Sequence, residues 1–130
     1  MKSLIKNRNR VKQVIDFTGV QNKKMHPSDI DAVLEFNDEA LILMEVKYKY
    51  NKIPIGQKLL LQRIADRWGE KAIVLKIEHT FNNDKLNIPL DKCEVTQIYY
   101  NNKWSVIKRT NVVEYLNKLG DKWDIEKCRF

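Results

Sequence analysis

The sequence is poor in the residues that usually cross-link a chain, bind zinc or make sharp turns. It has only two cysteines, two histidines, four glycines and three prolines among 130 residues. Cys93 and Cys128 lie far apart and form no CxxC or Cys/His cluster, so we expect free thiols, with Cys93 near the core, and no zinc site. No apolar run approaches the roughly 18 residues of a membrane span, and no signal-peptide pattern follows Met1. These absences predict a cytoplasmic protein with no membrane partner.

Acidic residues are scarce near the N-terminus. Residues 1–25 contain seven basic residues and one acid, so they hold +6 of the net charge of +7. A basic face of this kind attracts phosphate backbones, although a solvated helix face is an equally good interpretation of the charge alone. The candidate nucleic-acid contacts in this region are Lys6, Arg8, Arg10, Lys12, Lys23 and Lys24.

Apolar residues recur at spacings that predict one domain over residues 1–130. Helical spacing predicts helices over residues 3–16 and 55–69. An N-cap pattern at Asn111 with Glu114 predicts another helix, which we expect to end at Gly120. Alternating or continuous apolar runs predict strands over residues 17–20, 29–36, 40–48, 71–79, 93–100 and 103–108.

The order of these elements predicts an α/β (or α+β) fold with a mixed sheet flanked by helices. The strands over 29–36 and 40–48 should form an antiparallel hairpin. Strand, helix and strand over 40–79 imply a parallel pair with a right-handed crossover. A second hairpin, around Asn101-Asn102, and the last helix make a C-terminal unit over residues 93–120.

Two charged residues, Glu45 and Lys47, interrupt the apolar strand of the first hairpin. They are two residues apart, so their side chains leave the same face of the strand, about 7 Å from each other. If the loop is the three residues 37–39, Asp31 lies opposite Glu45 and Asp29 lies opposite Lys47. Burying such charges is costly unless they are paired or bind a metal.

Two carboxylates at this separation repel each other when both are ionised, and a Mg²⁺ or Mn²⁺ ion between them would remove the repulsion. Mg²⁺ prefers oxygen ligands, so the candidate ligands are Asp31, Glu45 and the Val46 carbonyl, with Asp29 as second choice. The ion would polarise a phosphate and acidify a water, and Lys47 would orient that water. The alternative interpretation is a cross-strand salt-bridge cluster on an exposed sheet face.

Over about residues 8–80 the chain resembles the PD-(D/E)XK nuclease superfamily, in particular its small phage-type or Holliday-junction-resolvase-like members. The matching residues are Pro27-Ser28-Asp29-Ile30-Asp31, Glu45-Val46-Lys47, Gln57 and the apolar strand 72–77. The resemblance implies a restriction-endonuclease-like core in which an Asp and a Glu bind Mg²⁺, a Lys serves the attacking water and a helical Gln lines the site. Two features depart from the pattern: Ser28 separates Pro27 from the acid, and the first predicted helix carries no Glu.

Gln57 has support that does not depend on the resemblance. It precedes Leu61 by four residues and Ile64 by seven, so the helix turns it toward the sheet together with its apolar stripe. We therefore predict a catalytic set of Asp31, Glu45, Lys47 and Gln57. Further candidates beside the site are His26 and His79, and Lys49 as a nucleic-acid contact.

The leading hypothesis is a Mg²⁺-dependent endonuclease that hydrolyses phosphodiester bonds of duplex or branched DNA. The resemblance also implies a homodimer and a bacterial or phage-infected cell as its setting. One alternative is a catalytically inactive nucleic-acid-binding module on the same fold. Another is a protein-interaction domain with a surface salt-bridge hairpin, which would bind neither metal nor DNA.

Overall fold

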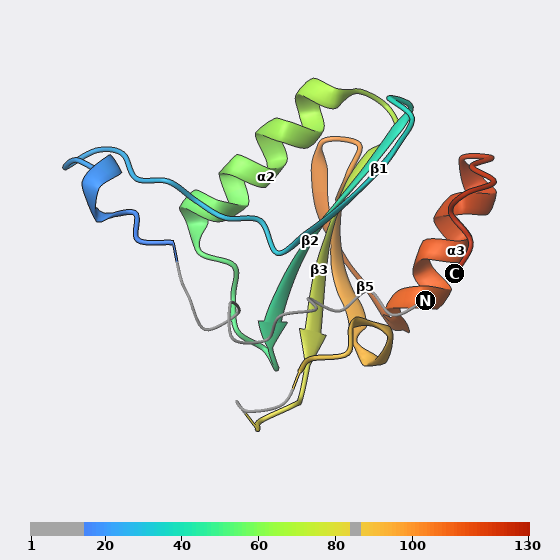
Figure 1. The fold of residues 1–130 in the computed structure, drawn as a ribbon. Helices are drawn as coiled ribbons and strands as arrows, with labels where there is room; N and C mark the ends of the chain where they lie inside the picture. Colours follow the sequence, from blue (N-terminus) through green and yellow to red (C-terminus); the bar gives the residue numbers. More distant parts are fainter. Residues whose placement is uncertain (1–14, 84–86) are drawn as a thin grey trace.

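The structure is a computed structural model that describes residues 15–83 and 87–130. Its described part is a five-stranded mixed sheet, in the order β1-β2-β3-β4-β5, with a helix on each face (Figure 1). The strands are β1 (Ala32–Phe36), β2 (Ala40–Tyr48), β3 (Ala72–His79), β4 (Glu94–Tyr100) and β5 (Lys103–Asn111). The helices are α2 (Ile55–Trp68) and α3 (Val112–Lys122), with two short 3₁₀ helices, η1 (Thr18–Val20) and η2 (Leu90–Lys92).

The strand directions confirm the predicted mixed sheet. β2 and β3 are parallel, whereas β1 with β2, β3 with β4 and β4 with β5 are antiparallel. A chain that leaves β2 and returns parallel to it in β3 must cross one face of the sheet, and α2 is that crossover. The second hairpin turns at Asn101 and Asn102, whose φ angles of 54° and 66° suit a tight hairpin turn.

Two apolar clusters attach the helices to the sheet. On one face, Leu43 of β2 packs with Leu61 of α2, and both are almost fully buried. On the other face, Ile42 belongs to the cluster that contains Leu116 of α3. Successive β2 side chains thus alternate between the two helices, because neighbouring residues of a strand point to opposite faces. Cys93 and Cys128 are buried free thiols.

The first hairpin has the predicted three-residue loop. Phe36 pairs with Ala40 and Val33 pairs with Leu43, so residues 37–39 connect β1 to β2. Asn37 and Asp38 have φ angles of 51° and 65°, a conformation that Asn and Asp tolerate better than most residues. The same register, continued past the start of β1, brings residue 31 beside residue 45.

The predicted strand over 29–36 begins three residues later than expected, at Ala32. The Val46 N–H donates to the Asp31 carboxylate, at 2.7 Å. If β1 were longer, this N–H would instead donate to its backbone. The alternation is therefore broken before Ala32. Strict alternation along 29–36 predicts that Ile30 and Leu34 share one face. This prediction is wrong, because Ile30 packs on the α2 side of the sheet and Leu34 packs on the α3 side.

Three other elements differ from the predictions in type or by more than one residue at an end. The predicted strand over 17–20 is a 3₁₀ helix, because the Asp16 side chain accepts hydrogen bonds from the Thr18 N–H and hydroxyl group. β5 runs on to Asn111, past a register shift between Val95 and Gln97 that hides the alternation. α3 continues to Lys122.

Gly120 does not end α3 but lies inside it. The glycine is buried, and a Cβ atom there would clash with the carbonyl oxygen of Cys128. Its role is thus a close approach between the helix and the C-terminal segment.

The predicted helix over 3–16 lies outside the described residues, except for Ile15 and Asp16, which are not helical. Within residues 15–83 and 87–130, no helix is long and apolar enough to cross a membrane.

Candidate functional site

The centre of the candidate site is the second half of β2, on the face that α2 covers. Leu41 and Leu43 pack under α2, and the same face continues with Glu45 and Lys47 where β2 passes the first turns of the helix. Glu45 is only 5% exposed, and Lys47 is half-buried. Glu45 is therefore an acidic side chain at a buried position where the pattern of the strand predicts an apolar one.

Asp31, the residue before β1, lies beside Glu45. Its Oδ2 accepts the Val46 N–H at 2.7 Å, which fixes its carboxylate against the β2 backbone. Besides burial, the Asp31 carboxyl group raises the pKa of Glu45, through hydrogen bonding and through its charge. The structure thus brings together the two acids that the hairpin register opposes.

Gln57 reaches the same place from α2. Its Nε2 donates to Glu45 Oε2 at 3.0 Å and to the Asp29 carbonyl oxygen at 2.6 Å. The second bond ties the segment before β1 to the helix. Gln57 therefore contacts the acid pair directly, as expected for a side chain on the apolar stripe of α2.

The surroundings of Glu45 favour its neutral form. Burial raises its pKa to about 7, and the hydrogen bond and charge of Asp31 add to the effect, whereas Gln57 and Lys47 act in the opposite direction. An acid whose pKa is displaced toward neutrality by burial and by a second carboxylate is typical of catalytic and metal-binding sites.

An open groove of about 810 Å³ gives access to these residues. It lies between α2, β2 and residues 15–31, which we call the N-terminal arm and which run beside the first turns of α2 (Figure 1). Of the predicted catalytic and metal-binding residues, Asp29, Glu45, Lys47 and Gln57 line the groove. Asp31 does not line it and meets Glu45 from the side of β1.

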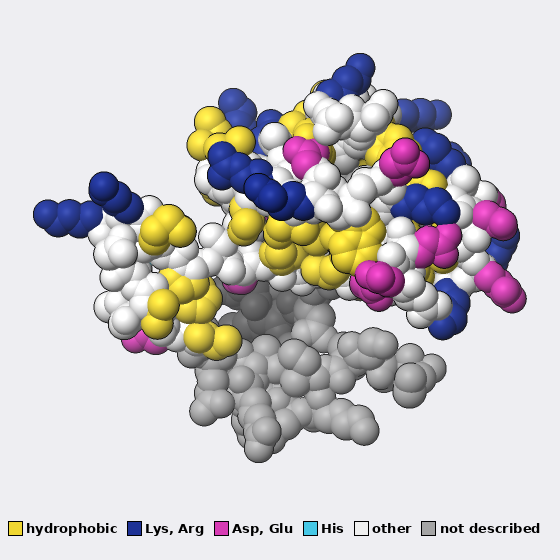
Figure 2. Space-filling view, turned by 90° about the horizontal axis from the view of Figure 1, so that it is seen from above, with side chains coloured by type: hydrophobic (Ala, Val, Ile, Leu, Met, Phe, Trp, Pro, Cys, Tyr) yellow, Lys and Arg dark blue, Asp and Glu magenta, His cyan; other side chains and the backbone are white. Residues whose placement is uncertain are grey.

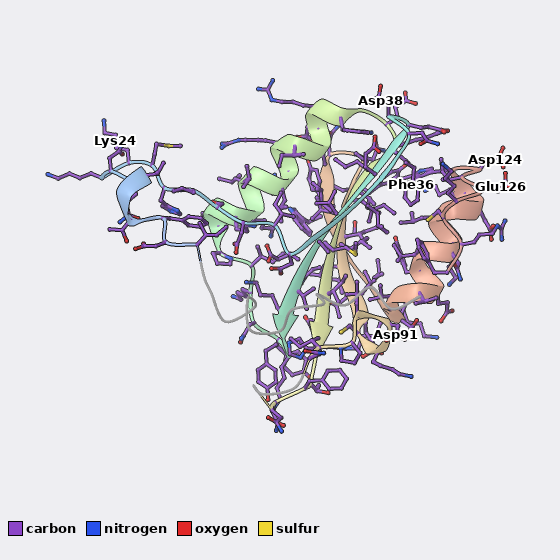
Figure 3. All side chains as sticks on the ribbon, viewed as in Figure 1. Lys24, Phe36, Asp38, Asp91, Asp124 and Glu126 are labelled. Carbon is purple, nitrogen blue, oxygen red and sulfur yellow. The ribbon has the colours of Figure 1, made fainter. Side chains whose placement is uncertain are left out.

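Basic side chains accompany the arm. Lys24 lies at its outer end and lines the groove, and Lys23 is exposed (Figure 3). In the space-filling view, Lys and Arg side chains lie at the tip of the arm, whereas most Asp and Glu side chains of that face lie away from it (Figure 2). Arg63 of α2 also lines the groove. The other predicted nucleic-acid contacts, Lys6, Arg8, Arg10 and Lys12, lie outside the described residues.

The two histidines have different surroundings. His26 is exposed and lines the groove, with Nδ1 at 3.0 Å from the Pro27 carbonyl oxygen. His79 ends β3, and its Nδ1 accepts the Phe81 N–H at 3.1 Å. His79 and Lys49 line a second pocket beyond the end of β2, so the structure does not bring them into the groove.

Few side chains around Glu45 could act as metal ligands. Within the described ranges, no three His, Cys, Asp or Glu side chains come together in a group able to hold a metal ion. Two adjacent carboxylates, one of them with a raised pKa, nevertheless suit a hard divalent cation, since Mg²⁺ binds through one or two carboxylates and keeps several waters. A cation there would also offset the burial and the charge of Asp31, both of which raise the pKa of Glu45.

A second charged cluster, which the sequence analysis missed, lies on the same sheet face. Glu78 of β3 is 6% exposed, and Lys76 Nζ contacts its Oε2 at 2.9 Å. Thr96 donates to the same oxygen at 3.1 Å, and Arg109 of β5 pairs with Oε1. A signal was present, because Lys76 and Glu78 break the apolar run of β3 two residues apart. The parallel register sets Lys76 beside Glu45 and Glu78 beside Lys47.

Comparison of the chain with protein-family models, with curated proteins and with solved structures gave no match. The chemistry open to the site follows from its own groups: a buried acid pair, an amide donor and a lysine at the wall of an open groove with basic residues along it. Such a set suits an anionic substrate and a divalent cation.

Proposed function

We propose that this protein is a divalent-metal-dependent nuclease that hydrolyses phosphodiester bonds of DNA. The observation that carries the proposal is Glu45, a buried acid with a pKa of about 7, held beside Asp31 and Gln57 at a groove that Lys47 also lines. The hairpin β1-β2 and the crossover from β2 through α2 to β3 agree with the restriction-endonuclease-like core that the resemblance implies.

Each residue has a role that its contacts support. Asp31 and Glu45 would hold Mg²⁺ or Mn²⁺, with Asp29 close by on the groove wall. When bound, the ion would polarise the scissile phosphate and lower the pKa of a water. Lys47 would orient the attacking water and offset the charge that develops on the phosphate. Gln57 is a positioning residue, because it donates to Glu45.

The groove supports an extended anionic substrate. It is open, residues from the arm, β2 and α2 line it, and Lys24 of the arm and Arg63 of α2 supply positive charge. Contacts of this kind bind phosphates without regard to base sequence. The affinity of the groove for DNA should therefore fall steeply as salt is added.

The test is cleavage of supercoiled plasmid and of a four-way junction in Mg²⁺ or Mn²⁺, with Glu45→Ala and Lys47→Ala beside the wild type. We expect losses of about 100-fold or more for each variant, the scale seen when an electrostatic catalytic group is removed. Glu114→Ala and Lys118→Ala are matched controls, because this exposed pair on α3 lies on the other face of the sheet. They should cut within about twofold of the wild type.

A second readout does not depend on cutting. Mg²⁺ at tenfold its dissociation constant should stabilise the folded wild type by about 1.4 kcal/mol, and Glu45→Gln should lose this stabilisation. DNA binding without cutting in any metal would contradict the nuclease and favour the catalytically inactive binding module. Cleavage that persists in Glu45→Ala would contradict the assignment of the active site to Glu45.

A further inference from the structure

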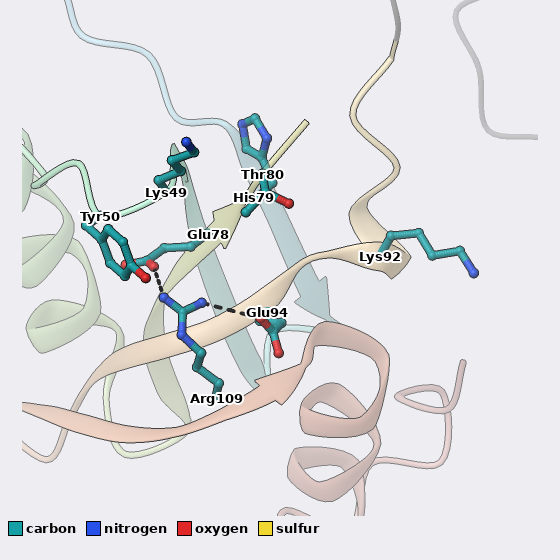
Figure 4. A pocket seen from close by; sticks show the side chains of 8 residues that line it. All are labelled: Lys49, Tyr50, Glu78, His79, Thr80, Lys92, Glu94 and Arg109. Atoms are coloured by element: carbon teal, nitrogen blue, oxygen red, sulfur yellow. Dashed lines mark hydrogen bonds and ion pairs between the residues drawn. The ribbon is translucent and has the colours of Figure 1, made fainter. Parts of the chain in front are cut away.

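A second pocket, of about 360 Å³, begins where the candidate site ends. Lys47 lines the groove, and two residues farther along the chain Lys49 lines this pocket. Two residues of extended chain span about 7 Å, so one polymer can contact both places. The pocket is lined by Lys49, Tyr50, Glu78, His79, Thr80, Lys92, Glu94 and Arg109 (Figure 4).

Aromatic rings gather at this edge of the sheet. The rings of Tyr48 and His79, which are neighbours in the parallel register, lie 5.5 Å apart, and Phe81 stacks on His79 at 6.0 Å. Tyr50 is 78% exposed and Phe81 is 40% exposed. Tyr50 lies two residues after β2 and Phe81 two residues after β3, and the exposed surface of both rings is open to a ligand.

The rings of Tyr48 and Tyr50 each lie next to a cationic side chain. Lys49 Nζ lies 5.1 Å from the centre of the Tyr48 ring, and the Arg109 guanidinium lies 5.5 Å from the centre of the Tyr50 ring. Both distances are within the range of cation–π attraction. Tyr50 therefore has a preferred position although most of its surface is open.

Two carboxylates, the buried Glu78 and the exposed Glu94, fix the guanidinium of Arg109 in turn. Arg109 pairs with Glu78 and, at 3.3 Å, with Glu94, as Figure 4 shows. Glu78 is itself anchored by Lys76 inside the sheet. The base of the pocket is thus set before any ligand arrives, which lowers the entropy cost of binding.

The charge of the pocket indicates the kind of ligand. The lining holds three cations, Lys49, Lys92 and Arg109, and two carboxylates, Glu78 and Glu94, so three positive charges against two negative ones leave a net charge of +1. Exposed rings beside lysines match single-stranded nucleic acid, whose bases stack on aromatic side chains while its phosphates contact cations. A duplex does not present free base faces, because its bases are stacked on one another.

We propose that this pocket binds unpaired bases of single-stranded DNA, with Tyr50 as the stacking residue. The substrate then has a single-stranded segment, which lies beyond Lys47 while the cleaved phosphate lies at Glu45. This placement of the cut rests on the proposed nuclease function. Binding of the single strand in the pocket does not.

The test is fluorescence anisotropy with a labelled oligo-dT of about 15 nucleotides, a length that covers a typical site, and with a duplex of equal length, both in EDTA to prevent cutting. Tyr50→Ala should weaken oligo-dT binding by about 5- to 150-fold, the range found for a lost base–aromatic stack. Tyr50→Phe keeps the ring and should bind within about twofold of the wild type. Phe130→Ala removes an exposed aromatic residue at the C-terminus and is the matched control.

The outcomes separate the two proposals. Unchanged oligo-dT affinity in Tyr50→Ala, or an equal loss for the duplex, would overturn the stacking site while metal-dependent cutting continued to support the nuclease. Oligo-dT binding that depends on Tyr50, in a protein that cuts no DNA, would support the stacking site and overturn the nuclease alone.

Discussion

Glu45 and Glu78 are two carboxyl groups on the same face of the sheet with opposite properties. They stand on the neighbouring strands β2 and β3 and are almost equally buried, at 5% and 6% exposure. The pKa of Glu45 is raised to about 7. For Glu78, burial again raises the pKa, but hydrogen bonds from Lys76 and Arg109 outweigh it, and the pKa is lowered.

The two side chains are almost equally exposed, but their partners differ. Glu78 meets Lys76 and Arg109 directly and has Thr96 as a third donor. Glu45 meets another carboxyl group and one amide. A buried carboxylate that is paired with cations remains ionised and stabilises the fold. A buried carboxylate without such partners can bind a proton or a metal cation. Glu78 is therefore a structural residue, whereas Glu45 is suited to bind a cation.

The largest predicted effect is the loss of stability in Glu78→Ala. This variant leaves the Lys76 ammonium buried without its carboxylate, and breaking a buried pair in this way costs about 3–5 kcal/mol. Urea denaturation should show the loss as a lower midpoint. Glu94→Ala is the control, because it removes an exposed carboxylate from the same Arg109 and should cost under about 1 kcal/mol. Equal effects of the two variants would contradict a structural role of Glu78.

The raised pKa of Glu45 predicts that the protein loses stability as the pH rises. Its pKa is higher in the folded state than the usual 4.5, so the folded protein binds this proton more tightly. Its contribution to stability is full below pH 4.5 and is lost as the pH rises through about 7. Allowing for solvent in the groove, we expect a loss of roughly 2 kcal/mol for the wild type relative to Glu45→Gln.

Denaturant titrations of both proteins from pH 4.5 to about pH 8 measure this difference. Parallel curves for wild type and Glu45→Gln would show that Glu45 titrates normally. Glu78 has the opposite sign, because its lowered pKa adds stability at neutral pH that is lost on acidification.

Much of this arrangement can be predicted from local patterns. The two-residue period of a strand is enough to set Glu45 and Lys47 on one face, and loop length is enough to choose Asp31 as the residue opposite Glu45. The helical period is enough to turn Gln57 toward the sheet. These predictions need only one element, or two elements joined by a short loop.

The rest depends on contacts between distant segments. The pairing of Glu78 with Arg109 requires the register of three strands, with shifts near Ile77 and Val95 that no local pattern reveals. The late start of β1 has a similar cause, because the Asp31 side chain takes a backbone N–H of β2 that strand pairing would otherwise use. When a side chain accepts a backbone hydrogen bond in place of a neighbouring strand, the periodicity of the sequence does not reveal it.

The smallest predicted effect concerns Gln57, which contacts Glu45 but none of the Glu78 cluster. Gln57→Ala loses the bonds to Glu45 and to the Asp29 carbonyl and should cost about 1 kcal/mol, because water in the groove replaces part of them. Gln57 lowers the pKa of Glu45, so the pH midpoint of metal-dependent cleavage should move upward. Gln62→Ala, on the same helix, is the matched control, since it loses the bond from Trp104 of β5 and should cost similar stability without moving the midpoint. A midpoint that stays constant in Gln57→Ala would show that Gln57 supports the fold and does not tune the acid.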